Sequence, residues 1–402
     1  MAAFGLSEVR VRGFRSLLDV TLRPGGVTAL VGEASAGKSN LLAAFRALLD
    51  PGTAAPTVDD VSVEGDGRIH IEGVLAPSRR VSLSGSPPQL IASRDGAPPV
   101  LFLPAALRSG RVVAAPAAEG EGPEGAARLL GGAIRELATH RRGPSDAASA
   151  AGLVRGIESC CETGQTGTLV LIEEPELFLR PHAQRYLYRL LRELAAAGNQ
   201  VIYSTHAPAF LNVARLEEFA LVERSGDGVT RIVQPEPLEP EEEFRVMSEF
   251  DAERSELFLS RAAILVEGRT ERLALPFVFR ALGRDVDRES ISIVECGGKA
   301  GIPLFVGICR AVGVPFVVLH DRDAPAGKRP SPAERALNSL IRRTAGPDRT
   351  VVLEPDFEGV AGLRSHRHKP EKAWLRFRSL SEADVPPPLR QAVALALSQA
   401  RD

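Results

Sequence analysis

The sequence predicts an α/β protein of two domains, each built on a mainly parallel sheet that helices cover on both faces. Apolar strand-like runs alternate with helix-like stretches along the 402 residues, as in parallel sheets with crossover helices. The alternation stops at residues 234–243, where three prolines and five glutamates occur, and then restarts. Such a stretch is typical of a linker. We therefore expect domains at 1–235 and 256–402, joined by a linker at 236–255.

The first domain opens with strand-like alternation over residues 8–32 and ends with helix and strand segments in turn. Its last early strand, 27–31, is wholly apolar and leads into a glycine-rich turn and a helix. The remaining expected elements are a helix at 41–49, short strands within 52–125, helices within 126–161, a strand at 168–172, a helix from Pro181 to about 197 and a strand at 200–203.

A phosphate-binding loop follows the apolar strand. Residues 32–39 read GEASAGKS and match the pattern G-x-x-x-x-G-K-[ST] between a strand and a helix. Glycines let backbone N–H groups surround phosphate oxygens, and the helix N-terminus adds positive potential. Lys38 would reach the β- and γ-phosphates, and the Ser39 hydroxyl would bind Mg²⁺. The residues expected to bind ATP here are Gly32, Ala36, Gly37, Lys38, Ser39 and Asn40.

Acidic residues and a histidine follow the next two buried strands. Glu173 and Glu174 end the strand at 168–172, and His206 follows the strand at 200–203. Ligands of open α/β sheets bind at these carboxyl ends. Glu173 would therefore hold Mg²⁺ through water, Glu174 would activate the attacking water, and His206 would contact the γ-phosphate.

These motifs resemble those of ABC ATPases of the RecF and structural-maintenance-of-chromosomes type. VRGFRSL, GEASAGKSN, LVLIEEPELFLRP and YSTHAP occur in the order of that family within residues 1–225. The resemblance implies an ATPase with Glu174 as catalytic glutamate, His206 as switch histidine, and Arg15 beside the nucleotide. Two motifs depart from the pattern: residues 149–152 are the nearest remnant of the signature motif, and Gln89 is the candidate for the Q-loop glutamine.

Carboxylates also end two strands of the second domain. Glu267 follows an apolar strand at 262–266, Glu271 lies on the next helix turn, and Asp321 and Asp323 follow a strand at 315–319. Between these strands lie a helix from about Thr270, a strand at 291–294 and a helix from Gly301. Neighbouring parallel strands would bring the acids together, and such hard oxygen ligands suit Mg²⁺ or Mn²⁺. Metal-assisted attack on a phosphodiester is the chemistry this predicts.

This pattern resembles the Toprim domain, and the whole chain resembles the overcoming lysogenization defect (OLD) family of ATP-dependent nucleases. LVEGRTERLALP and LHDRD carry the resemblance. It implies an ABC-type P-loop ATPase domain followed by a Toprim Rossmann-like domain. It further implies a second metal site at Asp356 and Glu358, with Lys369 as catalytic lysine. Expected cofactors are ATP and Mg²⁺, with Mn²⁺ an alternative at the Toprim site. Expected partners are DNA, a homodimer or higher oligomer, and an accessory helicase-like protein.

Composition limits how DNA would be held and where the protein works. With 49 basic and 51 acidic residues the net charge is −2, so contact with DNA has to come from local patches such as the basic residues of 364–378. Four cysteines without a C-x-x-C pair, and a start without a signal-like or membrane-spanning run, favour a cytoplasmic protein without a disulfide framework.

Two other functions remain open from the residues alone. One is an ATP-controlled DNA-binding or complex-forming module, for example in phage defence, with little cleavage of its own. The other is a primase or topoisomerase, which is disfavoured because no zinc-ligand cluster is present and all three tyrosines precede residue 204. DNA cleavage that depends on Glu267 and Asp321 would separate the nuclease from both.

Overall fold

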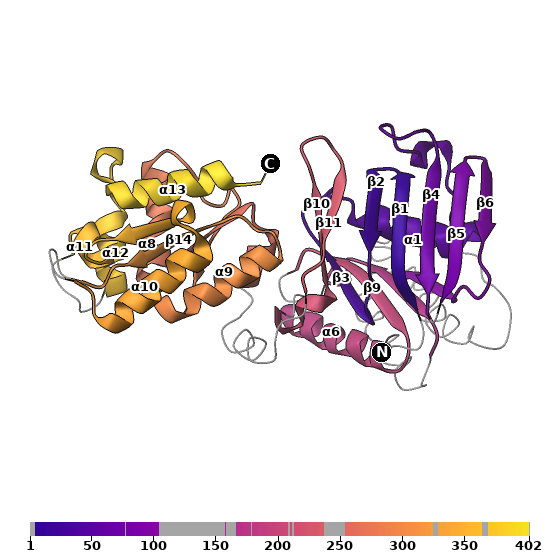
Figure 1. Cartoon of the computed structure of the whole chain (residues 1–402), viewed down its shortest axis with the longest axis horizontal. Helices are drawn as coiled ribbons and strands as arrows, with labels where there is room; N and C mark the ends of the chain where they lie inside the picture. Colours follow the sequence, from indigo (N-terminus) through magenta and orange to yellow (C-terminus); the bar gives the residue numbers. More distant parts are fainter. Residues whose placement is uncertain are drawn as a thin grey trace, which may run out of the picture. The chain divides into compact units, whose positions relative to one another are not determined.

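The chain folds into two compact units, residues 1–237 and 238–402 (Figure 1). The computed structural model describes residues 5–76, 78–103, 157, 166–177, 179–207, 210, 213–236, 254–324, 329–363 and 369–401. The region expected to be helical at 126–161, apart from residue 157, and most of the expected linker lie outside the described residues. No helix of the described residues is long and apolar enough to cross a membrane.

A six-stranded sheet forms the centre of the first unit, in the order β11-β10-β3-β9-β8-β7. Its strands are β3 (Val27–Val31), β7 (Val100–Leu103), β8 (Leu169–Glu173), β9 (Gln200–Thr205), β10 (Phe219–Arg224) and β11 (Thr230–Val233). All neighbours run parallel except β10 and β11. Strands β3 and β9 are buried on both faces, which explains why they read as continuous apolar runs.

The first unit also contains an antiparallel sheet, which the expectation of a mainly parallel sheet did not include. Its order is β2-β1-β4-β5-β6. The strands are β1 (Leu6–Phe14), β2 (Leu17–Leu22), β4 (Ile69–Leu75), β5 (Arg79–Ser86) and β6 (Gln89–Ser93). Alternate residues of β4 are buried, as in a sheet with one face in the core and one in solvent.

Helix α1 (Lys38–Leu49) packs between the two sheets, and α6 (Pro181–Ala196) packs on β3 and β9 of the parallel one (Figure 1). Because α1 contacts both sheets, its apolar residues are buried around most of the helix, with Leu41, Phe45 and Leu48 fully covered. They join residues of both sheets in one core. The short helix α2 (Pro51–Ala54) follows α1.

Replacing Phe45 by Ala is expected to lower the free energy of unfolding by about 3–5 kcal/mol, because a fully buried ring would leave a cavity between two sheets. Urea denaturation followed by circular dichroism measures this loss. Ile91→Ala is the matched control, since Ile91 is 77% exposed and its loss should change stability by less than about 0.5 kcal/mol. Equal losses in the two variants would contradict the packing described for α1.

The second unit has a four-stranded parallel sheet in the order β13-β12-β14-β15. The strands are β12 (Ala262–Val266), β13 (Ile291–Glu295), β14 (Phe316–Asp321) and β15 (Thr350–Leu353). The helices are α8 (Arg269–Ala281), α9 (Ile302–Ala311), α10 (Pro332–Ala345), α11 (Phe357–Ala361), α12 (Lys369–Phe377) and α13 (Pro387–Gln399). Helices α8 and α13 contact one another and the sheet, while α9 contacts β12, β14 and α10. The sequence predicted the bounds of β12, β13 and β14, and the first residues of α8 and α9, to within two residues.

Candidate functional site

The loop between β3 and α1 has the backbone that a phosphate-binding loop requires. Gly37 lies just before α1 with φ 113° and Ser35 has φ 65°, both in the left-handed region. A Cβ added at Gly37 would come within 2.3 Å of Thr230 Oγ1. Glycine is therefore required here for a close approach as well as for its φ. The first turn of α1 carries no acidic residue, so its N–H groups are directed at the loop without a competing charge.

Lys38 lies inside this loop. Its Nζ donates to the carbonyl oxygens of Gly32 at 2.8 Å and Glu33 at 2.6 Å, and the residue is 5% exposed. Burial lowers the pKa of Lys38 to about 8, although Glu174 and Glu176 oppose the shift. An anionic phosphate in the loop would offset the cost of this buried charge.

A hydrogen-bonded network supports the loop from behind. Thr230 Oγ1 donates to the carbonyl of Ala36 at 2.9 Å and lies 2.7 Å from Ser16 Oγ. Asn40 Nδ2 donates to Ser16 Oγ at 2.9 Å. Arg15, whose φ is 52°, donates to Asn40 Oδ1 at 3.2 Å and to Asp60 Oδ1 at 2.7 Å. Arg15 and Asn40 thus lie beside the first turn of α1, where a nucleotide contact was predicted, while the Ser39 side chain is exposed.

The ends of β8 and β9 bring the predicted catalytic residues together. Glu173 is in register with Ser204, and Glu174, with φ 44°, donates its N–H to the carbonyl of Ser204 at 3.0 Å. Glu174 Oε1 lies 3.5 Å from His206 Nε2. Burial, and next the Lys38 ammonium, lower the pKa of His206. Glu174 and His206 therefore face one another within the electrostatic reach of Lys38.

Glu176 was not singled out from the sequence, yet it organises this edge. Its Oε1 accepts from the N–H of His206 at 2.7 Å and from Thr205 Oγ1 at 2.9 Å. The residues 149–152 proposed as a signature remnant lie outside the described residues. Gln89 begins the edge strand β6 of the antiparallel sheet, and its side chain is exposed.

In the second unit, the carboxylates predicted from distant strands meet at one edge of the sheet. Val266 and Leu319 are neighbours in the β12–β14 pairing, so Glu267 follows beside the end of β14. The N–H of Asp321 donates to Glu267 Oε1 at 2.6 Å, and Asp321 Oδ1 accepts from the N–H of Phe357 at 2.8 Å. These contacts join the ends of β12 and β14 to the start of α11.

Two lysines are bonded to the carboxylates of this edge. Lys299, 7% exposed, donates to the carbonyl of Asp321, to Asp323 Oδ2 at 2.6 Å and to Glu334 Oε2 at 3.4 Å. Lys369 Nζ lies 2.9 Å from Glu358 Oε1, and this bond raises the pKa of Lys369.

Asp356 has a structural contact of its own. It caps α11 by accepting from the N–H of Gly359 at 2.7 Å. It also lies within electrostatic reach of Lys369, the lysine that contacts Glu358. The two carboxylates predicted for a second metal site therefore lie at the start of one helix, next to the predicted catalytic lysine.

The charges of the cluster interact strongly. Burial raises the pKa of Glu267 and of Glu271 to about 7. Burial, together with Glu267 and Asp323, raises the pKa of Asp321 to about 8. Carboxylates that repel one another in a buried site favour any cation that can approach them.

The donor set fits a hard divalent cation. Its members are all carboxylates, and two ammonium groups already neutralise part of their charge. No three His, Cys, Asp or Glu side chains among the described residues are arranged as a complete ligand set. The acids lie close together, but in this structure their oxygens accept hydrogen bonds from backbone N–H groups and lysines. Glu267, Glu271, Asp321 and Asp323 would hold one cation, and Asp356 and Glu358 a second.

Mn²⁺ is expected to stabilise the second unit more at pH 8 than at pH 6. Because the folded pKa values of Glu267, Glu271 and Asp321 are raised, these groups stabilise the metal-free fold at low pH, and this contribution is lost as the pH rises to 7–8. A cation competes with fewer protons at pH 8. The single tryptophan, Trp374, lies on α12, so its fluorescence reports thermal unfolding of this unit. An equal Mn²⁺ shift at both pH values would contradict the expectation.

Lys299 and Glu334 are site residues that the sequence analysis missed. Lys299 follows two glycines, both with positive φ, which come one residue after the end of β13. The sequence held a signal for Lys299, because Gly297 and Gly298 come just after a strand of the same parallel sheet as the acids. Glu334 lies on the first turn of α10, and nothing in its local sequence distinguishes it from a solvated helix start.

Both units match known protein families. Residues 258–323 match the model described as "Overcoming lysogenization defect protein-like, TOPRIM domain". Residues 154–212 match an "AAA domain, putative AbiEii toxin, Type IV TA system". The first match contains Glu267, Glu271, Asp321 and Asp323, and the second contains Glu173, Glu174 and His206.

Individual relatives agree with these matches. The chain is 37% identical over 262 residues to an OLD nuclease of Thermus scotoductus, which covers 60% of this chain and 50% of that protein. It is 30% identical over 168 residues to the Old nuclease of Escherichia phage P2, covering 40% of this chain and 29% of that protein. The chain thus spans half or less of the length of these two relatives.

Solved structures with similar folds include the C-terminal region of the Burkholderia pseudomallei OLD protein, with 18% identity, a TM-score of 0.30 and coverage of 35% of this chain and 98% of that one. Another is the SMC head domain from Thermotoga maritima, with 18% identity, a TM-score of 0.38 and coverage of 58% and 99%. The family matches and the OLD relatives show that the chain is similar to proteins of the overcoming lysogenization defect family, with an ABC-type ATPase domain followed by a Toprim domain.

Proposed function

We propose that the chain is an ATP-controlled nuclease that cleaves DNA phosphodiester bonds with divalent metal at the carboxylate cluster of the second unit. The observation that carries this proposal is the meeting of Glu267, Asp321 and Asp323, from two strand ends, with Lys299 and Lys369. At pH 8 and above such a cluster costs stability in the metal-free fold, because burial and mutual repulsion disfavour the ionised acids. The cost is explained if the cluster serves a cation.

The residues divide into ligands and a charge-stabilising group. Bound Mg²⁺ or Mn²⁺ would supply activated water and stabilise the leaving oxygen. Lys369, at the N-terminal end of α12 and 40% exposed in its side chain, would stabilise negative charge on the phosphate. Its contact with Glu358 keeps the ammonium beside the second pair of acids. Lys299 is more buried and bonds to the loop of Asp321 and Asp323, so we assign it to positioning.

The first unit would bind and hydrolyse ATP. Lys38 and the loop N–H groups would bind the phosphates, and Ser39 and Glu173 would bind Mg²⁺. Glu174 would activate the attacking water, and His206 would contact the γ-phosphate. This assignment is supported by the geometry of the two strand ends and the loop. The expected second copy of the chain and the helicase-like partner stay predictions.

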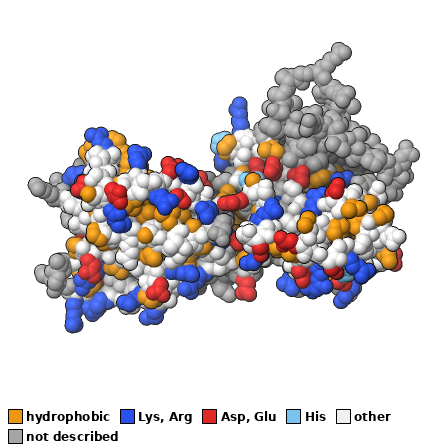
Figure 2. All heavy atoms as spheres, turned by 90° about the horizontal axis from the view of Figure 1, so that it is seen from above, with side chains coloured by type: hydrophobic (Ala, Val, Ile, Leu, Met, Phe, Trp, Pro, Cys, Tyr) orange, Lys and Arg blue, Asp and Glu red, His pale blue; other side chains and the backbone are white. Residues whose placement is uncertain are grey.

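DNA would approach the cluster along α12. After Lys369 this helix carries Lys372 and Arg376, and Arg378 follows its end, where its guanidinium lies 5.0 Å from the ring centre of the exposed Trp374. Elsewhere acidic and basic side chains are interspersed over the visible face of the described residues (Figure 2). A short basic helix face beside the cluster is therefore the favoured contact, and binding through it should weaken with salt.

A plasmid-nicking assay tests the proposal. The wild-type chain should convert supercoiled plasmid to open circles with Mg²⁺ or Mn²⁺ and lose this activity with excess chelator. Lys369→Met should reduce nicking about a hundredfold, because one charge-stabilising donor is removed. Asp287→Asn should nick normally, since this exposed acid precedes β13 at the opposite edge of the sheet. Nicking without metal, or equal nicking by Lys369→Met, would refute the assignment.

A further inference from the structure

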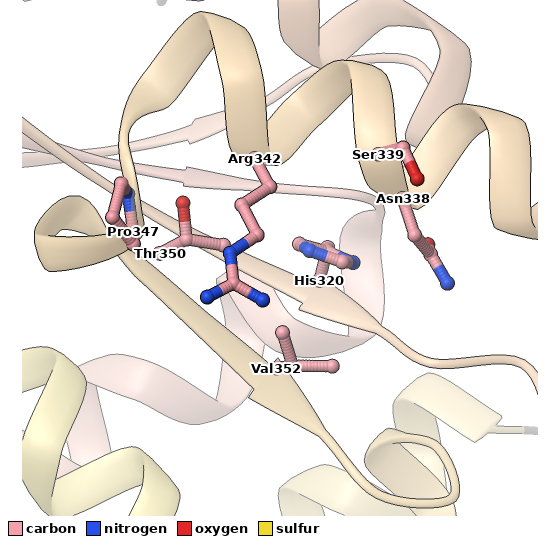
Figure 3. A pocket seen from close by; sticks show the side chains of 7 residues that line it. All are labelled: His320, Asn338, Ser339, Arg342, Pro347, Thr350 and Val352. Atoms are coloured by element: carbon pink, nitrogen blue, oxygen red, sulfur yellow. The ribbon is translucent and has the colours of Figure 1, made fainter.

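A pocket of about 390 Å³ lies on the α10 side of the second unit (Figure 3). Asn338, Ser339 and Arg342 line it from α10, His320 from β14, and Thr350 and Val352 from β15. Arg342 is four positions after Asn338 and three after Ser339, so its side chain lies near both on the helix surface. Figure 3 shows His320 between Asn338 and Arg342, with Val352 on the strand beneath.

Two buried polar atoms at this pocket have no hydrogen-bond partner among the described residues: His320 Nε2 and Asn338 Oδ1. His320 is 2% exposed. Buried polar atoms in folded proteins nearly always have a partner. Two such atoms lining the same pocket therefore indicate a ligand that supplies hydrogen bonds to them.

Both atoms are acceptors. His320 Nδ1 lies 2.9 Å from the carbonyl oxygen of Asp321, which can only accept, so Nδ1 carries the hydrogen and Nε2 of the neutral ring has a lone pair. Asn338 Nδ2 donates to the carbonyl of Arg322 at 3.2 Å, which fixes the amide orientation and leaves Oδ1 as the second acceptor. A ligand has to present donors, such as amino or ring N–H groups, at this end.

Arg342 and the apolar side chains set the rest of the ligand. The exposed guanidinium of Arg342 offers a fork of donors suited to a phosphate or carboxylate, and the Ser339 hydroxyl lies on the same helix face. Val352 and Pro347 provide apolar surface. The pocket is within the range of sites for ligands much larger than a single small amino acid. The ligand that fits this pocket is therefore larger than an amino acid, has N–H donors, has an apolar face such as that of an aromatic ring, and carries an acidic group. A nucleotide has all four properties.

We propose that this pocket binds a nucleoside monophosphate, with base amino groups at His320 and Asn338 and the phosphate at Arg342. The site is distinct from the ATP loop and from the carboxylate cluster, and the proposal does not depend on DNA cleavage. Both acceptor residues also bond to the backbone of residues 321–322. The bound nucleotide would therefore contact side chains that support the loop carrying Asp321 and Asp323.

Isothermal titration calorimetry of the full chain tests this site. A Lys38→Ala background and excess chelator remove the other two nucleotide-binding routes. We expect dAMP, dCMP and dGMP to bind, and deoxyadenosine or inorganic phosphate alone to bind at least tenfold more weakly. Arg342→Gln should weaken dAMP binding at least tenfold, and Asn338→Leu should also weaken it. Arg343→Gln is the matched control, because the neighbouring arginine does not line the pocket, and it should bind dAMP normally.

Absence of binding by all the nucleotides would overturn the proposal, as would equal dAMP affinity in the Arg342→Gln and control proteins. Tighter binding of glycine or glutamate than of dAMP would overturn it as well, in favour of an amino-acid site. Failure here is distinguishable from failure of the nuclease proposal. Plasmid nicking is measured with metal on a chain that retains Lys38. Nucleotide binding is measured on the Lys38→Ala chain with chelator, so neither ATP binding nor metal binding affects it.

Discussion

A Glu174→Gln variant is expected to hydrolyse ATP about 10²–10⁴-fold more slowly than the wild-type chain while it still binds ATP. Glutamine keeps the size of the side chain and its distance from His206, but it cannot take a proton from water. Lys38 and the loop glycines, which would hold the phosphates, are unchanged. Phosphate release measures hydrolysis, and a fluorescent ATP analogue measures binding.

The control for this variant is Glu193→Gln, an exposed acid on α6, which should hydrolyse ATP at the wild-type rate. The backbone of Glu174 gives a reason to expect a specific effect. Its φ of 44° is uncommon for a residue other than glycine, and its N–H is held by the carbonyl of Ser204. A strained backbone conformation of this kind is usually retained at functional sites, where the side chain needs a particular orientation. Hydrolysis within twofold of wild type would remove Glu174 as the base.

The local motifs were predictable because each is encoded over a few residues. The sequence of residues 32–39 specifies a glycine turn, a lysine and a helix start, and these occur in the structure. The acids after residues 172, 266 and 319 follow continuous apolar runs, and such runs become strands buried on both faces. Parallel strands have their carboxyl ends at one edge, so the meeting of Glu267 and Asp321 followed from the pattern alone.

The order of strands within a sheet could not be predicted, because no local sequence pattern specifies which strands lie side by side. Strand β12 lies between β13 and β14, and this order brings Lys299 to Asp321 and Asp323. The sequence placed three strands in this domain without their order, so Lys299 had no recognised role. The antiparallel sheet was missed for a related reason. Its strands alternate clearly, yet β1 pairs with β4 across more than fifty residues.

Short and polar elements also escaped prediction. Strand β15 has four residues, one of them an exposed valine, so its pattern is too short to distinguish from a loop. The His320 and Asn338 acceptors depend on β14 and β15 lying beside α10. That their side-chain atoms lack hydrogen-bond partners among the described residues is a property of the tertiary structure, which no local sequence pattern encodes.

An Asp321→Asn variant is expected to nick plasmid more than about 10–100-fold more slowly than the wild-type chain. That range is the loss caused by removing a residue that only supports a metal ligand, so a direct ligand should cost more. The metal-free fold of the same variant is expected to be more stable than the wild type at pH 8. Asparagine keeps an oxygen for the N–H of Phe357 but supplies no charge for a cation. The stability gain has its origin in the pKa of Asp321, which burial, Glu267 and Asp323 raise to about 8. Above that pH the wild-type aspartate carries a charge that the fold disfavours.

These opposite signs separate a functional carboxylate from a structural one. A structural aspartate, paired for stability, would lower the unfolding temperature when replaced, whereas Asp321 is expected to raise it and to abolish the Mn²⁺ shift reported by Trp374. Asp348→Asn is the matched control, an exposed acid just before the opposite end of β15, and it should change neither activity nor metal response. Lower metal-free stability with nicking retained would show that Asp321 holds the fold together and takes no part in cleavage. Because the carboxylates are buried and repel one another, we expect Asp321 to support DNA cleavage while it lowers the stability of the metal-free fold.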